Sequence, residues 1–95
     1  MSKTYMLTVT YKAKPGDAQT FVEELEKSGV AAAVRAENGC IAYDYYFSAK
    51  DADLIFLFEE WESAEHQQIH LTQPHIATLK QIKEKYILHS ELRVL

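Results

Sequence analysis

The sequence predicts an α+β domain with the element order β-α-β-β-α-β and an antiparallel sheet. Three observations predict this class. Apolar and polar residues alternate in four segments, apolar residues recur every three to four positions in two others, and most proline and glycine residues fall between segments. A chain of 95 residues has room for one hydrophobic core, so we expect a single domain over residues 1–95.

The first part of the chain supplies a strand and a long helix. Alternate residues are apolar from Met6 to Lys12, which is typical of a strand. Pro15-Gly16-Asp17 ends this strand, and Asp17 is suited to cap the following helix. The apolar spacing is helical from Ala18 to about Glu37, although Ser28-Gly29 is expected to loosen the middle. The predicted apolar stripe consists of Phe21, Leu25, Ala32 and Ala36.

A hairpin is predicted in the middle of the chain. Asn38-Gly39 ends the helix, because glycine readily takes the left-handed conformation found at helix ends. Strands are expected over Cys40 to Phe47 and Leu54 to Trp61, joined by the polar segment Ser48 to Asp53. Because Leu54 to Phe58 is apolar at every position, both faces of this strand should be buried.

The last part of the chain completes the pattern. Ser63 is the expected cap of a short helix that runs to about Leu71. Thr72-Gln73-Pro74 interrupts it, and Pro74 is suited to begin a second helix. Leu88 to Leu95 then alternates as a strand. The resulting order is the ferredoxin-like arrangement. Helices cover one face of such a sheet, so we expect a second copy to cover the other apolar face, giving a homodimer.

Composition excludes several kinds of partner. The formal net charge is −4 and the sequence contains no basic run, so no nucleic acid partner is expected. No membrane partner is expected either, because the surface is acidic and the longest apolar run, Leu54 to Phe58, is short. A single cysteine, Cys40, and an N-terminus without a long apolar stretch favour a reducing, cytoplasmic location.

Histidines mark the candidate site, since His66, His70 and His75 fall within ten residues. His66 and His70 lie four residues apart and could share a zinc ion, but the metalloprotease motif is absent and solvated side chains are favoured; no metal is expected. His70, close to the helix end, is suited to proton transfer near neutral pH, and equally to capping that helix. His75 is a weaker candidate, since the first turn of a helix disfavours positive charge.

Several of these segments resemble the antibiotic biosynthesis monooxygenase family of small dimeric α/β barrels. The resemblance spans nearly the whole chain, although its motifs are more specific for the fold than for the reaction. It rests on Lys14-Pro15-Gly16, Glu37-Asn38-Gly39-Cys40, Glu60-Trp61-Glu62-Ser63, His70-Leu71 and Pro74-His75.

Within that family the chain is most similar to bacterial quinol monooxygenases. This resemblance implies that the protein oxidises a small aromatic quinol or polyphenol with molecular oxygen and no cofactor. His70 would be the catalytic base or orienting group, and His75 its partner. The residues expected to bind substrate are Trp61, Tyr43, Tyr45 and His66. Trp61 is also a common kind of core residue, and neighbouring tyrosines on a strand cannot all face one way.

Two other functions stay open. A relative with a similar His-x-x-x-Pro-His segment isomerises a small phosphorylated signalling-sugar derivative, and such a substrate would need positive charge in the pocket. A non-catalytic dimeric ligand-binding domain is the third reading, because fold does not determine function. Haem breakdown is disfavoured, since haem-degrading relatives carry an asparagine in the first strand and Met6 to Thr10 contains none.

Overall fold

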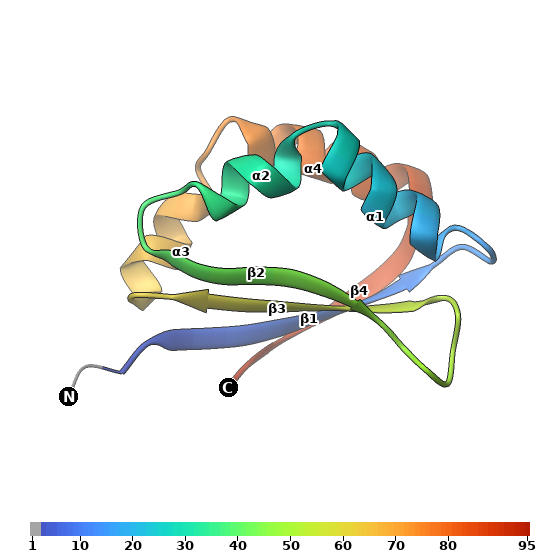
Figure 1. The fold of residues 1–95 in the computed structure, drawn as a ribbon, viewed down its shortest axis with the longest axis horizontal. Coiled ribbons are helices and arrows are strands. Elements are labelled where there is room, and N and C mark those ends of the chain that lie inside the picture. The colour runs from blue at the N-terminus through green and yellow to red at the C-terminus, as the bar shows by residue number, and fades with distance from the viewer. Residues whose placement is uncertain (1–2) are drawn as a thin grey trace.

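Four strands form one antiparallel sheet with helices packed over a single face (Figure 1). The structure is a computed structural model that describes residues 3–95. The elements are β1 (Tyr5–Ala13), α1 (Ala18–Lys27), α2 (Val30–Arg35), β2 (Cys40–Phe47), β3 (Leu54–Trp61), α3 (Ala64–His70), α4 (His75–Tyr86) and β4 (Ile87–Val94). The strand order β2-β3-β1-β4, with every neighbouring pair antiparallel, confirms the predicted ferredoxin-like α+β fold.

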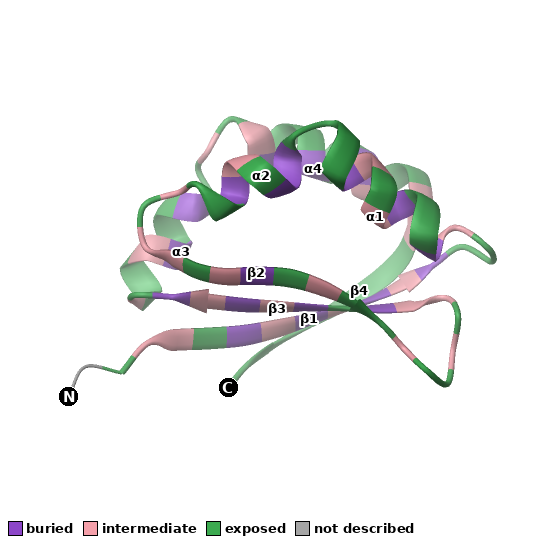
Figure 2. Ribbon diagram, in the orientation of Figure 1, coloured by how far each residue is buried: buried purple, intermediate pink, exposed green. Residues whose placement is uncertain are grey.

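The core lies between the two central strands and the helices. Alternate residues of β1 and β3 are buried, as the purple bands in Figure 2 show. Leu7 pairs with Glu59 and Val9 with Leu57, so these side chains share the helix-facing side of the sheet. The predicted alternation of β1 is therefore confirmed, and Trp61, the last residue of β3, is fully buried in the core.

The expected single helix from Ala18 to Glu37 is wrong, because the structure has two helices there. Gly29 takes a positive φ of 85° between α1 and α2, a conformation that glycine adopts at little cost. This break changes the direction of the chain and resets the helical phase. Ala32 and Ala36 are consequently exposed, and the second helix buries Val30, Ala31 and Val34 instead.

Two junctions position α3 beside the end of the sheet. The predicted cap is confirmed, since the Ser63 hydroxyl accepts a hydrogen bond from the backbone N–H of His66. Gly39 has a φ of 86°, and a side chain at this position would overlap the His66 ring. Glycine is thus needed at this turn for its conformation and for the close approach of α3. Pro74 precedes α4, as predicted.

No helix within residues 3–95 is long and apolar enough to cross a membrane.

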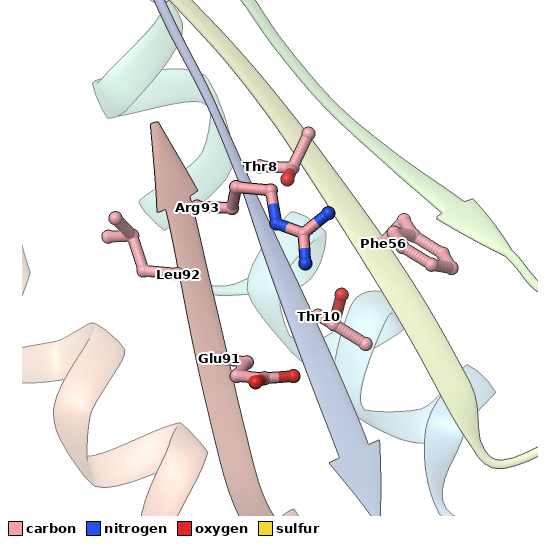
Figure 3. Close-up of a pocket in the computed structure, with 6 residues that line it drawn as sticks. All are labelled: Thr8, Thr10, Phe56, Glu91, Leu92 and Arg93. Carbon is pink, nitrogen blue, oxygen red and sulfur yellow. The ribbon is translucent and has the colours of Figure 1, made fainter. Parts of the chain in front are cut away.

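The helices leave the opposite face of the sheet uncovered, and that face carries large apolar side chains. Phe56 is 43% exposed and Tyr46, its neighbour across the β2–β3 pair, is 54% exposed. A hollow of about 280 Å³ lies on this face. Figure 3 shows the Arg93 side chain reaching between Thr8 and Thr10, with Phe56 on the neighbouring strand. One face of β3 is buried as predicted, whereas burial of the face that carries Phe56 stays a prediction.

Candidate functional site

A cavity of about 180 Å³ lies on the helix side of the sheet, beneath α3 and α4. A buried cavity of about 150 Å³ is enough to hold benzene, so this space can take an aromatic ring. Much of the wall is apolar, with a few polar groups that could fix the orientation of a ligand. The aromatic and ionisable residues in the wall are Tyr11, Tyr43, Glu59, His70, Lys80 and Lys83.

Glu37, His70 and His75 form a hydrogen-bonded cluster, of which His70 lines this cavity. Glu37 follows α2, His70 ends α3 and His75 begins α4, so three separate segments meet here. His70 Nδ1 lies 2.8 Å from Oε2 of Glu37, and His75 Nε2 lies 2.7 Å from the same oxygen. The Glu37 side chain is 9% exposed, and hydrogen bonds to a carboxylate are strong in such poorly solvated surroundings.

These contacts determine which nitrogen of His70 is available. An ionised carboxylate only accepts hydrogen bonds, so Nδ1 of His70 carries the proton that it donates to Glu37. In the neutral ring, Nε2 is then the acceptor. His70 Nε2 makes no hydrogen bond to any described residue. Every fully buried side-chain nitrogen or oxygen among the described residues has a partner, so Nε2 is not fully buried. Because His70 lines the cavity, this free nitrogen can meet a ligand there.

The same cluster is the set of residues that could hold a metal ion, with one ligand atom from each within 4.8 Å of the others. Two ligands of one tetrahedral zinc ion lie about 3.3 Å apart, given bonds of about 2.0–2.1 Å. The observed nitrogen–oxygen distances of 2.7 and 2.8 Å are shorter and fit direct hydrogen bonds. Glu37 thus has the geometry of a carboxylate that orients two imidazole rings.

Trp61 supports the other side of His70. The two ring centroids lie 4.8 Å apart at an interplanar angle of 35°, so the indole packs against the imidazole. The indole Nε1–H donates a hydrogen bond of 3.0 Å to Oε1 of Glu59. Glu59 is buried in the cavity wall, and its desolvation raises the pKa of this carboxyl, although the Trp61 N–H and His70 oppose that shift. Glu59 is a site residue that the sequence analysis missed.

Glu59→Gln is expected to stabilise the folded protein at pH 8, because an amide keeps the Trp61 hydrogen bond without burying a charge. The pKa of Glu59 is raised in the folded state, so its favourable contribution is full below the ordinary value of 4.5 and is lost as pH rises through the raised value. The gain should therefore disappear near pH 4. Chemical denaturation at both pH values checks this, with Glu62→Gln, on the exposed surface, as the control. Lower stability of Glu59→Gln at pH 8 would contradict it.

The tyrosines of β2 behave as the strand alternation predicts. Tyr43 is buried and lines the cavity, whereas Tyr46 lies on the opposite face. The Tyr43 and Tyr45 hydroxyls are 3.0 Å apart, and burial raises the pKa of both phenols, so neither is ionised at neutral pH. Tyr45 packs edge-on against Tyr43 and supports it from outside the cavity wall.

The structure brings most of the predicted site residues together, with Tyr45 beside Tyr43 and outside the cavity wall. His70 and Tyr43 line the cavity, and Trp61 and His75 contact His70 or its partner Glu37. His66 lies elsewhere: its Nδ1 is 2.7 Å from the Ser63 hydroxyl, and it lines a separate cleft near Glu37 and Asn38. A contact between His66 and a substrate stays a prediction.

Comparisons with known proteins identify a family and a shared fold. A family model described as Antibiotic biosynthesis monooxygenase matches residues 4–81. A solved structure from Pseudomonas aeruginosa is 27% identical, with a TM-score of 0.85, covering 100% of this chain and 94% of that one. The candidate antibiotic biosynthesis monooxygenase of Nitrosomonas europaea is 17% identical, with a TM-score of 0.88 and coverage of 100% and 90%. No curated protein matches the chain.

Proposed function

This chain belongs to the antibiotic biosynthesis monooxygenase family, and from that premise we propose that it oxidises a small aromatic quinol or polyphenol with molecular oxygen, without a cofactor. One observation carries the proposal. His70 is fixed by Glu37 so that an unprotonated nitrogen is available at a cavity of the size of an aromatic ring. A neutral imidazole held in this way is a general base.

Proton removal is the step that these residues can perform. His70 Nε2 takes the proton of a quinol hydroxyl, and the Glu37 carboxylate stabilises the imidazolium that results. The quinolate is electron-rich and reduces oxygen directly, so the protein need only bind, desolvate and deprotonate its substrate. Insertion of one oxygen atom at a ring C–H and loss of the other as water convert a quinol and O₂ into a hydroxyquinone and H₂O.

The surrounding residues have supporting roles in this scheme. Tyr43 contacts the substrate ring, because it is the buried aromatic residue of β2 in the cavity wall. Trp61 is a positioning residue that packs on His70, and His75 positions Glu37 through its hydrogen bond. Tyr45 positions Tyr43 through the bond between their hydroxyls.

The substrate assay is oxygen uptake with a panel of naphthoquinols and catechols, corrected for autoxidation in buffer. The proposal predicts uptake above that background and a product that has gained one oxygen atom. No protein-dependent uptake with any reduced aromatic compound would contradict it. The panel reports on activity alone and does not depend on which residue is the base.

One observation favours the isomerase as a second candidate. Lys80 and Lys83 lie in the cavity wall and supply the positive charge that a phosphorylated sugar derivative would need. His70 would then move a proton between carbon atoms, and no oxygen would be consumed. Isomerisation of a sugar phosphate without oxygen uptake would favour this function over the quinol reaction. Binding without turnover in either assay would favour a ligand-binding domain.

The protein is also proposed to act as a homodimer that pairs the uncovered faces of two sheets in an α/β barrel. Exposed Phe56 and Tyr46 on that face support this, because a face with such side chains is stabilised when a second copy covers it. Glu91 and Arg93 lie on the same face with opposite charges, and a two-fold axis can pair them reciprocally.

Phe56→Lys is expected to convert the dimer into a monomer, because burying two unpaired ammonium groups in a shared face costs several kcal/mol. Light scattering coupled to gel filtration measures the molar mass, which should fall from two chains to one. Gln81→Lys is the matched control, since it adds the same charge on an exposed position of α4. A wild-type protein that is monomeric at micromolar concentration would contradict the dimer.

A further inference from the structure

Two lysines of α4 lie at the cavity on the same side of the helix. Lys80 and Lys83 are three residues apart, so their side chains project from neighbouring positions on one helical face. Lys80 is exposed and Lys83 is half-buried, which places them at the boundary between the cavity and solvent. Among the described residues of the wall, Glu59 is the one carboxylate.

Lys80 and Lys83 differ from the lysines of the chain that form ion pairs. Lys12 and Lys85 each form an ion pair, with Asp51 and Glu24 respectively. Within residues 3–95, no carboxylate oxygen lies within 4 Å of the ammonium group of Lys80 or Lys83.

Lys83 instead lies over the ring of Tyr11, with its Nζ 5.4 Å from the ring centroid. Burial lowers the pKa of Lys83, and the nearby charge of Lys80 lowers it further. An anion bound beside Lys83 would favour the protonated ammonium and oppose this shift. No carboxylate oxygen of residues 3–95 lies within 4 Å of either ammonium group, so a bound anion can take that place.

We propose that the ligand of this cavity is an aromatic ring that carries an ionised acid group, a carboxylate or a phosphate, bound by Lys80 and Lys83. This inference rests on the proposed function and names the substrate class of the same site. An anion beside the lysines would form charge-assisted hydrogen bonds, while the ring packs on Ile76 and Leu79 of the same helix.

The acid group would also orient the ring. Glu59 disfavours an anion at its own part of the wall whenever it is ionised, so the acid group belongs at the lysine edge. A ring held at that edge by its acid group has a fixed orientation in the cavity. Such a substrate can therefore present one particular hydroxyl to His70, which a ring without an anchor would not do.

Binding of a matched pair of stable compounds tests this inference by calorimetry. The probes are 1-naphthol and 1-hydroxy-2-naphthoate, which share a ring and a hydroxyl and differ by the carboxylate. The wild-type protein is expected to bind the carboxylate about tenfold more tightly, the effect of one charge-assisted hydrogen bond. A third probe, 1-naphthyl phosphate, shows whether phosphate is preferred to carboxylate.

Variants of the two lysines test whether they cause the preference for the carboxylate compound. Lys80→Gln/Lys83→Gln should bind the two naphthalene compounds equally, with the affinity for 1-naphthol changed less than about twofold. Lys83→Arg keeps the charge and should keep the preference. Lys85→Gln is the matched control, because this lysine of α4 pairs with Glu24 away from the cavity, and its preference should be unchanged. If the double variant does not fold, the exposed Lys80→Gln alone should reduce the preference.

Two results would overturn the inference: equal binding of both compounds by the wild-type protein, or a preference that the double variant retains. Neither measurement involves oxygen, so they are independent of the quinol reaction. Acid preference without oxygen uptake on any quinol would support the inference and contradict the proposed function. Oxygen uptake on a neutral quinol, without a preference for the acid compound in binding, would support the proposed function and contradict the inference.

Discussion

His70→Asn is expected to lower kcat for quinol oxidation by about 10²- to 10⁴-fold, the usual contribution of a general base. Asparagine can still donate a hydrogen bond to Glu37 from the position of Nδ1, but it has no group that replaces Nε2. The change thus removes the proton acceptor and retains the contact that holds the loop after α2 against α3. Oxygen uptake under saturating quinol measures the effect, and circular dichroism checks the fold.

The control for this variant is His89→Asn, on β4. His89 is exposed and lies outside the cavity wall, so its replacement should change kcat less than about threefold. Equal activity of His70→Asn and the wild-type protein would remove the assigned base. A rate that recovers when the quinol is supplied at a pH where it ionises by itself would support the assignment, because the substrate then needs no base.

Trp61→Ala is expected to destabilise the protein by about 3–5 kcal/mol, the usual cost of removing a large aromatic residue from a core. Trp61 is fully buried, so its neighbours cannot fill the cavity that the variant leaves unless β3 moves. The variant also removes the N–H that bonds to Glu59 and the surface that packs on His70. Thermal unfolding at a fixed protein concentration measures the loss, which should lower Tm by more than about 10 °C.

Trp61→Phe separates packing from hydrogen bonding at the same position. Phenylalanine keeps most of the apolar surface but leaves Glu59 without its N–H partner, at a cost of about 1–3 kcal/mol. Phe47→Ala, at the exposed end of β2, is the aromatic control outside the core. A Trp61→Ala protein as stable as the wild type would mean that the core does not depend on this indole.

The fold followed from the sequence because strand alternation and turn residues are local signals. β2 and β3 have the predicted bounds, since turn residues sit on both sides of each strand. The sequence predicts one helix across Gly29, because apolar residues keep a helical spacing on both sides of this glycine. Only the positive φ of Gly29 shows that the phase changes there.

The site was predicted in part, because most of its contacts join residues far apart in the chain. Glu37 precedes His70 by 33 residues and His75 by 38, and no local pattern links them. Glu59 did carry a signal: it alternates in phase with Leu57 and Trp61, which places a carboxyl among inward-facing residues. Tyr43 lies on the same face because it pairs with Glu59 across the β2–β3 register, which the sequence alone does not specify.

Lys80 and Lys83 carried a similar signal that the sequence analysis did not use. Both lie on the helix that presents Ile76 and Leu79 to the sheet, about one turn or less from Leu79. A lysine at the edge of an apolar stripe usually extends to solvent. The pattern alone could not reveal the cavity at this edge, since its walls come from both ends of the chain.

A crystal structure with bound 1,4-naphthoquinone tests the central claim most directly, that a quinol reacts at the nitrogen of His70 which Glu37 leaves free. The quinone ring should lie beneath α3 and α4, with one oxygen about 2.6–3.2 Å from His70 Nε2, the distance that proton transfer requires. A ring bound instead in the hollow beside Arg93, or one whose oxygens do not approach His70, would contradict the claim.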